Sequence, residues 1–252
     1  MAEETGRNMA VRYEFYYWPS IQGRGEFVRL ALEDAGADYI DVAREPSNGG
    51  LGMRALLDLM DGESVERPPF APPFLKAGKL IIGQTTNILM FLGDRHGLAP
   101  KSDTGRLWVH QLQLTFADFV NETHDTHHPI ASDLYYEDQR GEARRRSAHF
   151  LKARAPKYLG YFERVLQRNP SGDKYLAGAR RSSADLSLFQ VVAGLRYAFP
   201  KTMARLEKKL PLAVALHDRI AERPNIRSYL ASPRRIAFND SGIFRQYPEL
   251  DR

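Results

Sequence analysis

Cysteine is absent from the 252-residue sequence. Its absence excludes disulfides, thiolate metal sites and cysteine nucleophiles among the protein's own side chains. Any thiol chemistry must therefore use a thiol that arrives with a substrate. A chain without disulfides also fits a cytoplasmic setting, which we expect here.

Long apolar runs are absent as well, since no stretch approaches the roughly 18 residues of a membrane span. The first ten residues, MAEETGRNMA, are polar and lack the apolar core of a secretion signal, so we expect a short N-terminal extension. The net charge is only +5, from 36 basic and 31 acidic residues, and the basic clusters are scattered. We therefore expect neither a membrane nor a nucleic acid as partner.

The first part of the chain alternates strand and helix patterns. Strands are predicted at 11–18, 39–43, 74–77 and 79–82, and helices at 25–36, 53–60 and 84–97. Thr85 or Thr86 is expected near the start of the last helix and Gly93 near its end. Four prolines at 68, 69, 72 and 73 exclude helix and central strand between the second and third strands. This order predicts an α/β fold with a small mixed sheet.

The second part is predicted to be entirely helical. Helical periodicity covers 105–128, 139–168, 183–199 and 211–222, and no strand pattern follows residue 105. The expected division is an α/β domain at 11–93 and an all-helical domain at 105–252. The irregular C-terminal tail carries Phe238, Phe244 and Tyr247, which either cover a pocket as a lid or pack on the helices, and packing is favoured.

Two motifs in the first part suit a ligand with a backbone and a carboxylate. A cis bond within APPFL would expose backbone groups to an extended peptide-like ligand, although Pro72 can offer only its carbonyl. Gln84 and Thr85 stand where a strand gives way to a helix, and free N–H groups at a helix start favour an anion. A rigid loop and an ordinary helix cap are the plainer interpretations of these motifs.

The stretch FYYWPSIQGRGE (15–26) places three hydroxyls, on Tyr16, Tyr17 and Ser20, just before a glycine turn and a helix start. In the helical part, Ser182 and Asp185 have the S-x-x-D spacing of a reciprocal capping box ahead of an apolar run.

In their order and spacing, YYWPSIQGRGEFVRLAL, PPFLKAGKLIIGQTTNI and SSADLSLFQ resemble the cytosolic glutathione transferase superfamily over about residues 11–230. The resemblance implies a thioredoxin-like domain that binds glutathione, a helical domain that helps to bind a hydrophobic electrophile, and a homodimer. Glutathione would be a co-substrate, and no cofactor is implied.

The family's functional positions map onto this sequence one by one. Gln84 and Thr85 match the pair that holds the γ-glutamyl end of glutathione, with threonine in place of the usual serine. Pro73 matches the cis-proline, and Pro72 the residue that pairs with the cysteinyl backbone, where a proline cannot donate. Ser182 and Asp185 match the buried capping box, a folding element.

The resemblance also implies a group that stabilises the glutathione thiolate. A hydroxyl that donates a hydrogen bond to the sulfur favours the charged form. Tyr17 matches the tyrosine of tyrosine-type members, but with one extra residue before the turn and Gln22 in place of the family's arginine. Ser20, which precedes Arg24 as in serine-type members, is the rival, and Tyr16 is a distant third. Arg24 could add positive charge near the sulfur or pair with a surface acid.

NETHDTHHP (121–129) contains three histidines at helical spacing, with Pro129 expected to end or kink the helix. Structural or surface histidines are one interpretation. A polar wall of the electrophile pocket, formed by Asn121, His124 and His128, is another, because the resemblance places this helix at that pocket. The pattern is not H-E-x-x-H, and no metal site is predicted.

Together these features predict a glutathione transferase that activates the thiolate for attack on a soft electrophile, with a role in detoxification. A non-catalytic protein of the same fold that binds a ligand or a partner is the alternative, and a glutathione-dependent isomerase or peroxidase is a third possibility.

Overall fold

The computed structural model describes residues 12–62 and 65–251, so the predicted N-terminal extension lies outside the described residues. The alternating pattern at the start of the chain forms strand β1 (Tyr13–Tyr16), which is followed by helix α1 (Gly25–Ala35). Helix α1 ends at Gly36, as expected.

The remaining strands are β2 (Tyr39–Asp41), β3 (Phe74–Ala77) and β4 (Leu80–Gly83). The four strands form one sheet in the order β2-β1-β3-β4, with β2 parallel to β1 and the other pairs antiparallel. The predicted small mixed sheet is therefore confirmed.

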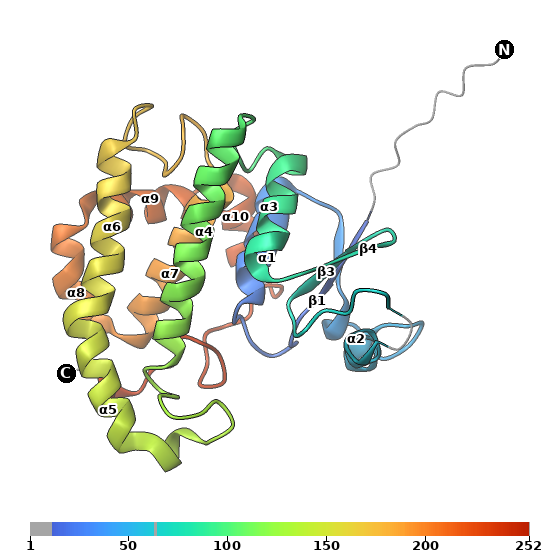
Figure 1. The fold of residues 1–252 in the computed structure, drawn as a ribbon, viewed down its shortest axis with the longest axis horizontal. Helices are drawn as coiled ribbons and strands as arrows, with labels where there is room; N and C mark the ends of the chain where they lie inside the picture. The colour runs from blue at the N-terminus through green and yellow to red at the C-terminus, as the bar shows by residue number, and fades with distance from the viewer. Residues whose placement is uncertain (1–11, 63–64, 252) are drawn as a thin grey trace.

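Helices cover both faces of the sheet (Figure 1). Helices α1 and α3 (Thr85–His96) lie between the sheet and the helical part, whereas α2 (Gly52–Asp61) lies on the opposite side. Gly93 lies three residues before the end of α3, near the end as expected. The helix ends at His96 because Gly97, with φ 63°, takes the left-handed conformation that stops it.

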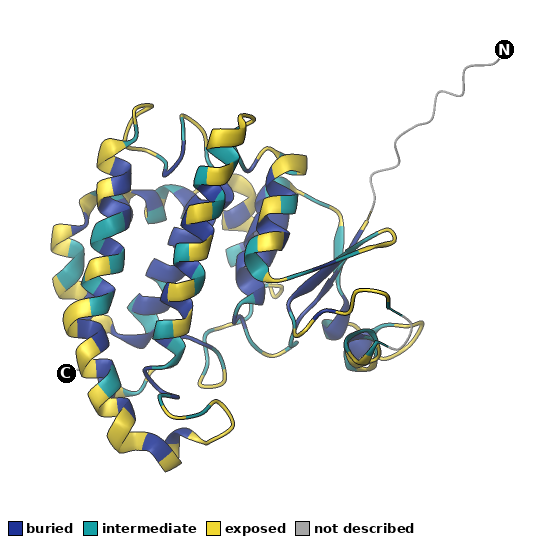
Figure 2. Ribbon diagram, viewed as in Figure 1, coloured by how far each residue is buried: buried dark blue, intermediate teal, exposed yellow. Residues whose placement is uncertain are grey.

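The helical part begins with α4 (Asp103–His124) and continues with α5 (Arg140–His149), a π-helical turn (Phe150–Arg154) and α6 (Ala155–Arg168). Helices α7 (Ser183–Ala198), α8 (Pro200–Leu206), α9 (Pro211–Ala221) and α10 (Pro224–Leu230) follow. Helix α7 is buried along most of its length, whereas α4 and α6 turn an exposed face outward (Figure 2). Within the described ranges, none of the helices is both long and apolar enough to cross a membrane.

The predicted capping box at the start of α7 is confirmed. The Asp185 carboxylate accepts hydrogen bonds from the backbone N–H and the hydroxyl of Ser182, at 2.6 and 2.9 Å, and from the N–H of Leu176 at 2.7 Å. Because Asp185 is fully buried, desolvation raises its pKa to about 6.

The C-terminal tail packs on the helices, as favoured from the sequence. Phe238 stacks on Tyr197 with ring centroids 5.0 Å apart, and Tyr247 stacks on Tyr136 at 3.8 Å. Phe244 is buried against Gly194, where a Cβ atom would lie 2.4 Å from the phenylalanine ring. In the tail, the Asp251 carboxylate caps the start of α8 by accepting from the N–H groups of Lys201 and Thr202.

Candidate functional site

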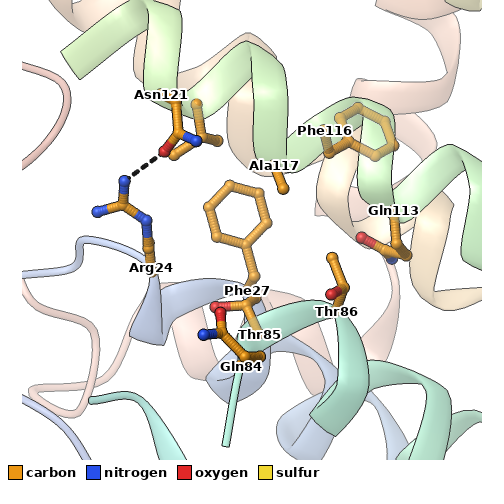
Figure 3. Close-up of a pocket in the computed structure, with 10 residues that line it drawn as sticks. Arg24, Phe27, Gln84, Thr85, Thr86, Gln113, Phe116, Ala117 and Asn121 are labelled. Atoms are coloured by element: carbon orange, nitrogen blue, oxygen red, sulfur yellow. Dashed lines mark hydrogen bonds between the residues drawn. The ribbon is translucent and has the colours of Figure 1, made fainter. Parts of the chain in front are cut away.

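A pocket of about 140 Å³ lies where the starts of α1 and α3 face the middle of α4 (Figure 3). Its polar side chains come from all three helices, and its apolar side chains come from α1 and α4. The lining residues are Arg24, Phe27, Gln84, Thr85, Thr86, Gln113, Phe116, Ala117, Val120 and Asn121.

Gln84 and Thr85 lie together at the start of α3, as predicted. Among the described residues, Gln84 is the one non-glycine residue with a positive φ, at φ 67° and ψ 124°. Such a conformation costs about 1–3 kcal/mol and is often found at functional sites. The Thr85 hydroxyl is buried and has no hydrogen-bond partner among the described residues. This end of the pocket therefore offers an unused hydrogen-bonding group to a ligand.

The Pro72–Pro73 peptide bond is cis, as expected. Phe74 pairs with Gly83 in the register of β3 and β4, so Pro73 and Gln84 lie side by side at the same end of these two strands. An extended ligand could contact both segments. Pro72 has no N–H and leaves only its carbonyl as a backbone contact.

Tyr17 lies beneath the turn that leads into α1. Its side chain is buried, and its hydroxyl oxygen accepts a hydrogen bond of 2.8 Å from the backbone N–H of Arg24. A Cβ atom on Gly23 would lie 2.0 Å from that oxygen, so this close approach requires glycine. Burial raises the pKa of Tyr17, which keeps the phenol neutral and able to donate its proton. Tyr17 stands behind the pocket lining and is not part of it.

The other two hydroxyls of this stretch have different surroundings. Ser20 is exposed, and its backbone carbonyl accepts from the Asn239 side chain at 2.9 Å. Tyr16 belongs to the core on the opposite face of the sheet and donates to Glu14 at 2.7 Å. Tyr17 is therefore the one of the three hydroxyls that contacts the start of α1.

Arg24 reaches across from α1 to α4. Its guanidinium donates to the side-chain oxygen of Asn121 at 2.6 Å (Figure 3). This partner is a neutral amide and not the surface acid of the predicted alternative, and Arg24 lines the pocket.

The sequence did not identify the pocket contribution of three residues. These residues are Phe27, Gln113 and Phe116, which lie inside predicted helices and line the pocket. Gln113 is buried, and its amide nitrogen has no partner among the described residues. A glutamine on the apolar face of a predicted helix is a signal for a polar site in the interior. The direction in which the Gln113 side chain points depends on how α4 packs against α1 and α3.

The histidine cluster forms at the end of α4 and in the turn that follows the helix. The helix ends at His124, and turn hydrogen bonds bring His127 and His128 back beside it, with ring centroids 4.7–5.1 Å apart. The pocket described above includes Asn121 but neither His124 nor His128. The His127 Nε2 atom lies 2.8 Å from the Ile243 carbonyl oxygen, which can only accept, so this nitrogen carries the proton.

Burial lowers the pKa values of all three histidines, to about 2 for His127 and about 4 for His128, and in the direction of the neutral form for His124. The cluster is therefore neutral near pH 7. Over residues 12–62 and 65–251, no group of three or more His, Cys, Asp or Glu side chains is arranged to hold a metal ion.

Comparison with known proteins agrees with the fold. Residues 124–233 match the family model described as glutathione S-transferase, C-terminal domain. The chain is 27% identical to glutathione S-transferase P 1 of Xenopus laevis over 224 residues, which cover 88% of this chain and 93% of that protein. It is 23% identical to a glutathione S-transferase of Plasmodium falciparum over 86% of this chain and 94% of the relative.

Solved structures show the same architecture. A monomeric glutathione S-transferase from the hookworm Necator americanus superposes with a TM-score of 0.69 at 21% identity, covering 90% of this chain and all of that one. The Pi-class enzyme of Onchocerca volvulus gives 0.66 at 20% identity, covering 86% and 91%. Residues 124–233 therefore match a glutathione S-transferase C-terminal domain, and the chain as a whole is similar to glutathione S-transferases along most of its length.

Proposed function

We propose that this protein is a glutathione transferase that activates the thiol of glutathione for attack on a soft electrophile. The observation that carries the proposal is the arrangement of Tyr17 and Arg24 at the start of α1, next to a pocket whose far side is the Gln84-Thr85 start of α3. On this proposal, an activating hydroxyl and an anion-binding helix start would both serve one ligand.

Glutathione would bind extended along the edge of the sheet. The start of α3, with its free N–H groups, suits the carboxylate of the γ-glutamyl end, and the Gln84 and Thr85 side chains add hydrogen bonds. The cis Pro72–Pro73 segment would run beside the cysteinyl part of the ligand, where Pro72 contributes one hydrogen bond instead of two. Glutathione serves as a co-substrate, and the proposal includes no cofactor.

Tyr17 would stabilise the thiolate. A glutathione thiol has a pKa near ~8.5 and is mostly protonated at neutral pH. The Tyr17 hydroxyl accepts from the Arg24 N–H, which leaves its own proton free to be donated to sulfur. A hydrogen bond to a charged group contributes about 1.5–3 kcal/mol, enough to lower the thiol pKa by about 1–2 units. Arg24 would add positive charge, and Ser20 remains the alternative hydroxyl.

The thiolate would then form a carbon–sulfur bond with a hydrophobic electrophile held against the helical domain, near Asn121, His124 and His128. The thiol proton leaves to solvent and the sulfur lone pair forms the new bond. The electrophile's displaced electron pair either departs with a leaving group or takes up a proton from water.

A non-catalytic binding protein is the second candidate. Pro72, which lacks one donor for the ligand backbone, and the burial of Tyr17 behind the pocket lining favour it. This candidate predicts ligand binding without a change in the thiol pKa.

The proposal extends to organisation in the cell. The division into domains at 11–93 and 105–252, a homodimer, a cytoplasmic location and a role in detoxification are all implied by the resemblance. A dimer is further supported by exposed apolar side chains near the pocket, among them Met90 on α3 and Leu107 and Leu114 on α4.

The first test is a glutathione titration at about pH 6.5, roughly two units below the ordinary thiol pKa of ~8.5, followed by thiolate ultraviolet absorbance. We expect a saturable thiolate signal. Binding without that signal would favour the carrier, and no binding would overturn the proposal.

Tyr17→Phe tests the assignment of the hydroxyl. We expect a rate loss of about 10–100-fold with nearly unchanged glutathione affinity, since the lost hydrogen bond to a charged group is worth about 1.5–3 kcal/mol. Ser20→Ala is the matched control and should retain wild-type turnover. A normal rate for Tyr17→Phe together with an inactive Ser20→Ala would transfer the role to Ser20.

A further inference from the structure

The turn that carries Tyr17 and Arg24 is held by buried side chains from the other end of the chain. Gln22, the residue before the turn glycine, is buried, and its amide nitrogen donates to the Ile236 carbonyl in the tail at 2.5 Å. Its amide oxygen accepts from the Gln190 side chain on α7 at 2.8 Å. Both polar atoms of the Gln22 side chain are therefore tied to the helical domain.

The contacts continue from Gln190 back to α1. The fully buried Gln190 accepts from the Arg235 guanidinium at 3.1 Å, and Arg235 also pairs with the buried Glu26 on α1. The backbone N–H of Glu26 donates to the Gln22 carbonyl at 2.9 Å. The path Gln22–Gln190–Arg235–Glu26 thus closes on itself around the start of α1.

The acidic member of this ring is well compensated. Glu26 accepts from Arg235 and, at 2.7 Å, from the Tyr229 hydroxyl on α10, and lies 3.5 Å from the buried Arg29. A buried carboxylate with several partners resists displacement, because leaving any of them unpaired is costly. The neutral amide pair Gln22–Gln190 is the direct side-chain link between α7 and the turn.

From these contacts we infer that Gln190 is a positioning residue for thiol activation, which acts through Gln22 on the Arg24 N–H and the Tyr17 hydroxyl. The inference rests on the proposed function for its chemical consequence. The geometric part, that Gln190 fixes the turn, stands without it.

The physical reason is the short path between the two sites. Gln22 is two residues from Arg24, and the Gly23 between them has a positive φ and no side chain to hold the turn by itself. The 2.8 Å contact between the Arg24 N–H and the Tyr17 oxygen depends on where this segment sits. A buried amide that loses its partner relaxes toward new hydrogen bonds, which would move the segment.

Gln190→Leu removes both amide contacts with little change in volume, and Gln190→Glu keeps an acceptor for Arg235 while removing the donor to Gln22. For both variants we expect hydrogen exchange of the backbone N–H groups of residues 20–26 to be faster by about fivefold, the effect of one lost hydrogen bond of about 1 kcal/mol. The thiol pKa of bound glutathione should rise by about half a unit or more.

Gln139→Leu is the matched control. Gln139 is also fully buried, but its amide bonds the backbone of residues 130, 131 and 134, far along the chain from the turn. This variant should lose stability while the exchange of residues 20–26 and the thiol pKa stay at wild-type values. Gln22→Leu breaks the same link from the turn side, and its effect on exchange should not add to that of Gln190→Leu.

The two readouts separate the two claims. Unchanged exchange at residues 20–26 in folded Gln190→Leu and Gln190→Glu would overturn the inference whether or not the wild type binds glutathione. Faster exchange with an unchanged thiol pKa, in a wild type that does activate the thiol, would also overturn the positioning role. Absence of a thiolate signal in the wild type would instead overturn the proposed function, and exchange alone would then decide the geometric part.

Discussion

Gln84 combines backbone strain with a position at the pocket. A non-glycine residue at φ 67° has a steric cost of about 1–3 kcal/mol, and only the surrounding fold keeps it there. The strained residue lines the pocket and directly precedes the unpaired Thr85 hydroxyl. This coincidence suggests that the strain places the side chain for a ligand and does not serve stability.

Gln84→Gly tests this interpretation. Glycine relieves the positive φ, so the variant should be more stable than wild type by about 1 kcal/mol while binding glutathione more weakly. Urea unfolding and a glutathione titration measure the two effects. Gln84→Ala is the control, because it keeps the strain and removes the same side-chain hydrogen bonds. A loss of stability in Gln84→Gly, or unchanged glutathione affinity in both variants, would contradict the interpretation.

For single residues, the sequence predicted the position in a helix or turn better than the contacts of the side chain. Gln84 and Thr85 were placed at a helix start and are found there, and the bond before Pro73 is cis as expected. The burial of Tyr17 under Gly23 could not be anticipated, because it depends on how the turn folds back over the ring. Phe27 was missed as a pocket residue for the same reason: its partners come from α4, nearly a hundred residues later.

The start of α7 offers a direct comparison of two neighbouring serines. Ser182 takes part in the capping box, where its N–H and hydroxyl donate to the Asp185 carboxylate. Ser183 is equally buried, but its hydroxyl has no partner among the described residues. The same side chain therefore has opposite energetic roles at adjacent positions.

Ser182→Ala should destabilise the protein by about 1 kcal/mol, because a buried carboxylate loses a hydrogen bond and the helix loses its cap. Ser183→Ala should be neutral or slightly stabilising, since the unpaired hydroxyl already carries its desolvation cost. Thermal or urea unfolding of both variants provides the comparison. If the two variants shifted stability equally, the capping box would not be the element that holds the start of α7.

Helix ends were the least predictable part of the elements. The predicted 105–128 helix ends four residues early, at His124, since the imidazoles of His127 and His128 find partners in the tail and in each other. Here a contact with a distant segment overrides the local pattern.

The histidine cluster connects the end of α4 to the C-terminal tail. His127 donates to the Ile243 carbonyl, and its ring faces His124, His128 and Tyr247. Arg245 adds positive charge near His127 and His128, while Asp125 and Glu137 offer His128 partial compensation. Burial lowers the pKa of His127 to about 2, so the folded state disfavours its protonation.

The sign of the pH dependence follows from this depressed pKa. An unfolded histidine binds a proton below about pH 6.5, whereas folded His127 does not, so stability is lost as pH falls from there. Between pH 7 and pH 5 one such histidine should cost about 2 kcal/mol. His127→Gln keeps a donor for Ile243 without titrating, so its unfolding free energy should fall less over this range. If the unfolding free energies of the variant and the wild type changed equally with pH, His127 would not be the source of the pH dependence.

The largest features were predictable because they follow from repeated patterns. The mixed sheet and the all-helical second part were each indicated by many residues at once, so single errors did not change the result. The ring around Gln22 was not predictable, since it joins three segments that are far apart in the chain: residues 22–26, Gln190 and Arg235.

At the scale of the whole molecule, the exposed apolar side chains bear on the proposed dimer. Leu107 and Leu114 are exposed by 68% and 49% on one side of α4, and Met90 is exposed by 43% on the adjacent α3. Contiguous apolar side chains on a surface often mark a protein–protein interface. A related hookworm enzyme is described as monomeric, so the fold alone does not decide the question.

We expect light scattering to give about twice the chain mass of 28.7 kDa for the wild type. Leu107→Glu should shift the protein toward the monomer by weakening association at least about tenfold, because a buried charge without a partner is costly at an interface. Ile130→Glu alters a side chain that is 59% exposed beyond the other end of α4, and should leave the mass unchanged. A wild type that stays at the monomer mass at micromolar concentration would show that these leucines serve another contact. A dimer insensitive to Leu107→Glu would place the interface elsewhere on the molecule.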